Sequence, residues 1–301
     1  MSSQVPVAPV PVAPRVTARR QRFRPKRFLL RAGLNALALL VFAVMVFPVF
    51  WMVSTAFKPA SEILTFTPKL IPSSLTFANF EDAIHRPYFW RVARNSLLVV
   101  AAVTTLSLLM AFLAALALAK FGFYGRRAFI VLIIAVQMIP LNALIIPLYI
   151  LLSRAGQVDK LSGLIITYLT FVLPFTVWTL RGFVLGVPKE LEEAAMVDGS
   201  TRVGAFLRIL LPLVGPGLVA TSIFAFIQAW NEYIIAYVLL SSESKQTLTI
   251  WLAEFTTGTT RGVDWGTLMA SATLTALPVI IFFVLVHRRI AFGLTAGAVK
   301  Q

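Results

Sequence analysis

Residues 188–212 read PKELEEAAMVDGSTRVGAFLRILLP, a polar segment between two apolar runs of membrane-spanning length. Proline suits the start of a helix, because its missing N–H has no partner in the first turn. Three acidic residues follow where the positive end of the helix dipole stabilises negative charge: Glu190, Glu192 and Glu193. Gly199 supplies a left-handed stop, and a second short helix is expected before Pro212. The segment predicts a short, rigid helical projection between two membrane spans.

One face of this predicted helix is shallow. Its residues fall at i, i+3, i+4 and i+7, and they are Leu191, Ala194, Ala195 and Asp198. Two alanines on this face leave room for close approach. We therefore expect the projection to fit into a groove of another protein.

Six apolar runs of at least 19 residues, each with at most one charge, predict six transmembrane helices. The runs are Gly33–Val53, Ser96–Ala119, Ala128–Leu152, Ser162–Leu180, Gly217–Leu240 and Leu268–Val286. Prolines lie inside them at Pro48, Pro140, Pro147, Pro174 and Pro278. Neighbouring helices can satisfy the backbone groups that a proline frees, so kinks are expected rather than breaks. The fold class is all-α, a polytopic membrane protein with a helix between spans four and five.

The basic residues predict the orientation of these spans. One face of the membrane, with both ends of the chain and residues 181–212, carries 18 lysines and arginines, and the other face carries 9. The richer side is cytoplasmic by the positive-inside rule. We therefore expect a multi-pass protein of the cell (plasma or inner) membrane with both termini and the 188–212 segment in the cytoplasm.

Composition excludes several classes of function. The formal charge of +15 is spread over cytoplasmic loops, where it indicates contact with anionic lipid rather than nucleic acid. There are no cysteines and only two histidines, His85 and His287, so no metal site is expected. No Gly-x-x-x-x-Gly-Lys-Ser/Thr phosphate loop and no catalytic triad are present, so we expect no catalytic residues and no cofactor bound by this chain.

The spacing within 188–212 resembles the signature cytoplasmic loop of ABC importer permeases. The matching residues are Glu193-Ala194-Ala195, Gly199, Ile209 and Leu211-Pro212. The resemblance implies a coupling helix that docks into a cleft of an ATPase subunit. It implies coupling roles for Glu190, Glu192, Glu193, Ala194, Ala195, Asp198, Gly199 and Pro212. It also implies two ATPase subunits that hold ATP and Mg, a second permease subunit (a homologous heterodimer partner by analogy) and an extracytoplasmic solute-binding protein.

Two further segments extend this resemblance over roughly residues 26–301. Ser54–Phe80 resembles the first external loop of the sugar-type permeases, and Phe292–Lys300 resembles the tail of the smaller permease in maltose-type importers. Residues 1–27 precede this region as a basic tail, which begins with a Pro/Val/Ala stretch that cannot bury a core and is expected to be disordered. Residues 28–301 are predicted to form the six-span permease domain.

Span five contains Glu232, an ionisable residue within the predicted spans. With Gln228 and Asn231 it occupies i, i+3 and i+4, beside Trp230, and this face would line the solute pathway. Gln137 and Asn142 in span three are further candidates for the same pathway. The alternative is that Glu232 joins helices together, or acts in gating, paired with a basic residue.

The sequence thus predicts one permease subunit of an ATP-driven importer for sugars or sugar-like solutes. An ion-coupled secondary transporter is the alternative, with Glu232 as the candidate for ion coupling. A membrane scaffold without transport would not require a polar face in span five.

Overall fold

The computed structural model describes residues 25–257 and 263–297, and every regular element in them is helical. The chain divides into two compact units, residues 1–49 and residues 50–301, and each is described by itself. The predicted tail lies outside the described residues except for 25–27, and so do residues 298–300 of the C-terminal segment. The first unit contributes most of α1, Pro25–Ala56, which Pro48 does not interrupt.

The second unit begins with the end of α1 and a loop held by polar contacts. Its short helices are α2, Ala60–Ile63, and α3, Ala78–His85. The Lys58 side chain is 2% exposed, donates to the Lys69 carbonyl at 2.6 Å and lies 4.1 Å from the Trp51 ring centroid. The loop predicted after span one is therefore ordered around a buried lysine rather than by helical periodicity.

Five helices in the described residues are long and apolar enough to cross a membrane, and a bent helix pair makes a sixth span. The elements of the second unit from the second span onward are α4 (Phe89–Lys120), α5 (Arg126–Gln137), α6 (Ile145–Arg154), α7 (Leu161–Leu185), α10 (Leu211–Asn231) and α13 (Trp265–Gly297). The five helices and the bent pair coincide with the six predicted spans.

Helix α4 is central, because it packs along α7 and also against α10 and α12 (Leu248–Thr257). It supplies residues to two hydrophobic clusters. Toward its start, Val92, Val99 and Val103 pack with residues that include Leu164 and Trp230. Toward its end, Ala111, Ala115 and Leu118 pack with Leu180 and Val214. Small residues in the second cluster allow the helices to approach closely.

Span three is broken rather than kinked. Helix α5 ends at Gln137 and a short 3-10 turn, η1 (Leu141–Leu144), precedes α6, so that the two halves meet at 96°. Pro140 lies at the break, where it lacks an N–H and disfavours helical backbone at the residue before it. The prediction of a kink is wrong at Pro140, although Pro48, Pro174 and Pro278 do lie inside continuous helices.

Span five is also shorter than predicted. Helix α10 ends at Asn231, Glu232 is extended (φ −70°, ψ 128°), and a separate short helix, α11, covers Ile234–Leu239. The predicted helical face of Gln228, Asn231 and Glu232 is therefore wrong for Glu232. Its backbone leaves the helix, and its carboxylate accepts hydrogen bonds from the Ile235 and Ala236 amides in α11.

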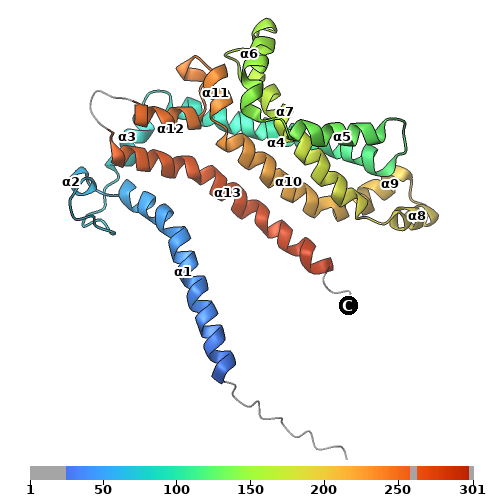
Figure 1. Cartoon of the computed structure of the whole chain (residues 1–301), viewed down its shortest axis with the longest axis horizontal. Coiled ribbons are helices and arrows are strands. Elements are labelled where there is room, and N and C mark those ends of the chain that lie inside the picture. Colours follow the sequence, from blue (N-terminus) through green and yellow to red (C-terminus); the bar gives the residue numbers. More distant parts are fainter. Residues whose placement is uncertain (1–24, 258–262, 298–301) are drawn as a thin grey trace, which may run out of the picture. The chain divides into compact units, whose positions relative to one another are not determined.

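The remaining elements lie at the two ends of the second unit. Helices α8 (Lys189–Val197) and α9 (Arg202–Ala205) lie at the end opposite to α3 and α12 (Figure 1). The second short helix predicted before Pro212 is therefore present as α9, and a π-helical turn, η2 (Phe206–Leu210), joins it to α10. Pro212 falls in the first turn of α10, where its missing N–H is tolerated.

At the α12 end, Asp159 ties two loops together. Its carboxylate accepts hydrogen bonds from the Ser241 and Ser242 amides, from the Ser242 hydroxyl at 2.6 Å and from Lys245 at 2.7 Å. Burial alone would raise the pKa of this carboxyl, but the hydrogen bonds from Lys245 and Ser242 outweigh it and hold the pKa below its usual range. The turn before α7 is thereby fixed to the segment 241–245, which includes η3 (Glu243–Lys245).

Candidate functional site

The predicted projection is present as α8, and its ends have the expected chemistry. The helix starts directly after Pro188, with Glu190 and Glu192 in its first turn. At its end Gly199 has a φ of +89°, the Gly199 amide bonds the Met196 carbonyl, and the Ser200 amide bonds the Ala195 carbonyl. This pair of bonds is a Schellman motif, which requires a residue in the left-handed region. The projection is therefore short because a glycine stops it.

The residues assigned to coupling divide between two sides of α8. Those that are exposed are Glu190, Glu193, Ala194, Asp198 and Gly199. Ala195 is half-buried on the opposite side, together with Glu192. Pro212 is exposed at the start of α10. The exposed side thus offers two glutamates and a small residue to a partner.

Glu192 contacts another helix of this chain. Its Oε1 accepts a hydrogen bond at 2.6 Å from Lys120, the last residue of α4, which also donates to the Val187 carbonyl at 3.4 Å. The two side chains are 14% and 24% exposed, so this ion pair is screened less than a pair on an open surface. It joins α8 to a helix that is distant in the sequence.

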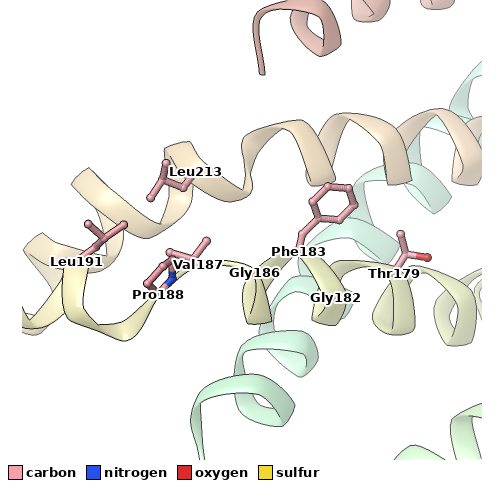
Figure 2. Close-up of a pocket in the computed structure, with 8 residues that line it drawn as sticks. All are labelled: Thr179, Gly182, Phe183, Gly186, Val187, Pro188, Leu191 and Leu213. Atoms are coloured by element: carbon pink, nitrogen blue, oxygen red, sulfur yellow. The ribbon is translucent and has the colours of Figure 1, made fainter. Parts of the chain in front are cut away.

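An apolar groove lies beside the start of α8, with a volume of about 480 Å³. Figure 2 shows it between the end of α7 and the start of α10, with Leu191 and Pro188 at one end and Thr179 at the other. Gly182 and Gly186 line this groove, and a Cβ on Gly182 would meet nothing within 4 Å. Gly217 on α10 is approached closely by α7, because a Cβ there would overlap the Phe183 ring.

The break in span three opens onto a cavity of about 550 Å³. Its polar lining comes from Gln137, Thr170 and Gln228, and its aromatic lining comes from Phe171, Phe175 and Phe224. The rings of Phe175 and Phe224 have centroids 3.8 Å apart. Two of the predicted pathway residues, Gln137 and Gln228, therefore meet in one cavity although 91 positions separate them.

The other predicted pathway residues do not line this cavity. Asn142 lies on η1 and Asn231 ends α10, and both are exposed. Trp230 is 5% exposed and stacks on Phe226 in the core, with ring centroids 5.6 Å apart. Four further residues of the cavity lining were not predicted from the sequence, because no sequence pattern separates them from core residues. They are Thr170, Phe171, Phe175 and Phe224.

The Glu232 carboxylate is bound within the chain. It accepts hydrogen bonds from the Tyr168 hydroxyl at 2.7 Å and from the amides of Ile235 and Ala236 at 2.7 and 3.1 Å. The amides belong to the first turn of α11, which the carboxylate caps. The partner is a phenol on α7 rather than a basic side chain, and no sequence pattern indicated Tyr168.

Residues 104–295 match the family described as "Binding-protein-dependent transport system inner membrane component". The chain belongs to this family. It is a permease subunit of an ABC importer and not an enzyme.

Two similar relatives are permease proteins of sugar uptake systems. The diacetylchitobiose uptake system permease protein DasC of Streptomyces coelicolor is 45% identical over 253 residues, which cover 84% of this chain and 91% of that protein. The trehalose transport system permease protein SugB of Mycobacterium tuberculosis is 35% identical, with coverage of 84% and 92%.

The fold is also found in a solved structure. A chain in the crystal structure of a bacterial ABC transporter involved in the import of the acidic polysaccharide alginate aligns with a TM-score of 0.76 at 22% identity, covering 89% of this chain and 99% of that chain. This likeness shows the fold.

Proposed function

We propose that this chain forms half of the translocation pathway of an importer for disaccharides or oligosaccharides. The observation that carries this is the cavity at the break of span three, where two amides and a hydroxyl lie among three aromatic rings. Amides bond sugar hydroxyls, and aromatic faces stack on the apolar faces of sugar rings, so the lining suits a carbohydrate. The names of the relatives at 45% and 35% identity, which transport diacetylchitobiose and trehalose, support the same class.

Broken spans suit such a pathway. Helices are interrupted in a membrane only where protein or a water-filled cavity satisfies the freed backbone groups. The interruption of span three lines the cavity, and that of span five follows Gln228 by a few residues. Asn142, Asn231, Trp230 and Glu232 lie outside the wall of this cavity.

An ABC importer permease works with ATPase subunits, a second permease and a solute-binding protein. We assign the ATPase contact to the exposed side of α8, because its glutamates and its small alanine face out of the chain. Two ATPase subunits bind ATP and Mg, while this chain binds neither. The second permease is a homologous partner, and the solute-binding protein docks on the opposite side of the membrane.

The family places the chain in the inner membrane. With 18 of its 27 basic residues on the side of α8, that side and both termini are cytoplasmic. The α12 end of the second unit is then external, as a docking surface for a solute-binding protein requires.

Ion-coupled transport is not favoured. Its candidate coupling residue, Glu232, uses both carboxylate oxygens for the Tyr168 hydroxyl and the α11 amides. A coupling carboxylate must exchange its proton or ion in each cycle, and these three hydrogen bonds oppose that exchange.

The test is uptake by proteoliposomes that contain the complex recovered with this chain from its native membrane. Labelled diacetylchitobiose and trehalose are offered with the co-purified binding protein, with ATP inside the vesicles or with an imposed proton or sodium gradient. We expect uptake of a saccharide with ATP alone. Uptake driven by a gradient without ATP would refute the proposal.

Gln228→Ala makes the test specific to the cavity. Loss of one or two hydrogen bonds to a sugar corresponds to about a tenfold or greater loss of transport efficiency. Asn231→Ala, at an exposed position outside the cavity lining, is the matched control. Equal uptake by Gln228→Ala and the unaltered chain would remove this cavity from the solute pathway.

A further inference from the structure

Helix α4 differs from every other candidate span in the described residues, because it contains neither proline nor glycine. It is 32 residues long, which corresponds to about 48 Å at 1.5 Å per residue. The spans that flank α8 in the sequence both contain proline: α7 contains Pro174 within a continuous helix, and α10 contains Pro216 and follows a π-helical turn. Prolines and π turns are where helices bend. Of these helices, α4 is therefore the best suited to transmit a displacement along its axis.

The cytoplasmic end of α4 is attached to α8. Lys120 donates to the Glu192 carboxylate at 2.6 Å and to the Val187 carbonyl at 3.4 Å. Glu192 lies on the side of α8 that faces the chain, so an ATPase on the exposed side leaves this ion pair intact. A displacement of α8 would reach α4 through this contact.

The external end of α4 is attached to the segment before α12. The Asn95 amide donates to the carbonyls of Ser244 and Gln246, both at 3.1 Å. One position further on, the Ser96 hydroxyl accepts from the Leu248 amide at 2.7 Å. These side chains are buried, and they bond backbone groups about 150 positions away in the sequence. The segment 244–248 is thus carried by α4.

We propose that α4 is a rigid rod that transmits the motion of the ATPase-docking helix α8 to the external segment 244–248. Lys120 and Glu192 form its cytoplasmic attachment and Asn95 its external one; all three are positioning residues. The inference rests on the proposed function, since it takes α8 as the ATPase contact. In this proposal the motion passes through α4, which is span two, and not through α7 or α10, the spans that precede and follow α8 in the sequence.

The absence of cysteine in this chain allows a reporter at one position. Ser241 is exposed three residues before the segment 244–248, and Ser241→Cys can be labelled with a maleimide in the complex held in lipid nanodiscs. The labelling rate is compared without nucleotide and with MgATP plus vanadate. A rod that couples the two ends changes this rate by about fivefold or more, the lower range of allosteric coupling.

Glu192→Gln and Asn95→Ala are then combined with the reporter, singly and together. Each alone is expected to reduce the nucleotide effect to less than about twofold, and the double variant to add nothing, because both interrupt one route. Independent sites this far apart would have additive effects instead. The double variant Lys120→Glu/Glu192→Lys can form the ion pair with the charges exchanged. It is therefore expected to restore the effect of nucleotide on the labelling rate that Glu192→Gln loses.

Glu62→Gln is the control, because it removes another lysine–carboxylate pair, to Lys69 at 2.9 Å, that does not involve α4. It is expected to retain the full response. The ATPase retained by each variant is measured, and labelling is compared among assembled complexes only. The proposal that α4 transmits the motion would be refuted if Glu192→Gln or Asn95→Ala kept the full effect of nucleotide on labelling. It would also be refuted if the losses in the two single variants added up in the double variant.

The two proposals fail in different ways. If the reporter chain retains an active ATPase but shows no nucleotide response, the rod is refuted while the permease function stands. If the reporter chain retains no ATPase at all, the ATPase contact on α8 is refuted, and the rod with it.

Discussion

Both oxygens of the Glu232 carboxylate have donors within the chain, from α7 and from α11. A carboxylate at membrane depth is costly unless it is hydrogen-bonded. Here the donors are a phenol and two backbone amides, so the residue holds the end of α10, the start of α11 and the middle of α7 together. Its chemistry in this chain is that of a cap and a cross-link.

Tyr168→Phe is expected to lower stability by about 1.5–3 kcal/mol, because it removes one hydrogen bond to a charged group while retaining the ring. Glu232→Ala is expected to cost more, since it also removes the cap of α11 and leaves the Tyr168 hydroxyl without this acceptor. Thermal unfolding in detergent measures both. Glu232→Ala with unchanged stability but no uptake would instead indicate contact with solute.

The hydrogen bonds of Asp159 predict that the stability of the folded chain depends on pH in the acid range. Its pKa is held below the ordinary value of about 3.9 by Lys245 and Ser242, so its contribution to stability is complete above that value and declines as the pH falls toward the lower, folded pKa. The unaltered chain should therefore lose stability on acidification below about pH 4.

Asp159→Asn should lower the melting temperature at neutral pH and reduce this acid dependence. Melting temperatures measured at intervals from pH 7 to pH 3 test this prediction. The control is Glu243→Gln, which lies on the same segment but does not contact Asp159. Parallel curves for Asp159→Asn and the unaltered chain would contradict the assignment.

At the scale of elements, α8 shows how local chemistry defines a docking surface. Pro188 precedes its start, Gly199 ends it, and Thr201 caps the next helix by accepting from the Gly204 amide at 3.0 Å. Only the four residues 198–201 lie between α8 and α9, so the connection between the two helices is short. The exposed side of α8 is consequently held in one orientation.

Gly199→Pro and Glu193→Lys should both insert into the membrane but lose the ATPase. Proline cannot adopt the φ of +89° at position 199, and lysine at 193 reverses a charge on the exposed side of α8. We expect at least about a tenfold weaker retention of ATPase, the effect of losing 1.4 kcal/mol.

Co-purification in mild detergent measures the retained ATPase. Lys69→Gln, a charge change at the other end of the second unit, is the control. Normal retention and normal uptake in both Gly199→Pro and Glu193→Lys would exclude the exposed side of α8 as the docking surface.

At the scale of the whole molecule, the orientation in the membrane can be tested with single cysteines. Ser74, between α2 and α3, and Tyr124, between α4 and α5, are both exposed and lie on opposite sides in the proposed topology. A membrane-impermeant maleimide should label Ser74→Cys in intact cells and Tyr124→Cys only after lysis. The reverse pattern would invert the topology.

The sequence alone determined the membrane class, the number of spans and the position of α8, because each depends on local properties. Twenty or so apolar residues must cross a bilayer, and proline and glycine set the ends of a short helix. Of the face predicted from the periodicity of α8, Leu191, Ala194 and Asp198 are exposed, whereas Ala195 is half-buried.

Only the tertiary structure decided which prolines break a span and which polar residues meet. Pro140 accompanies a 96° bend while Pro174 stays within α7, although both lie in apolar runs, because the outcome depends on which neighbouring groups satisfy the freed backbone. The pairs Glu232–Tyr168 and Lys120–Glu192 join residues 64 and 72 positions apart. Such contacts depend on how the helices pack against one another, and no local pattern in the sequence specifies that packing.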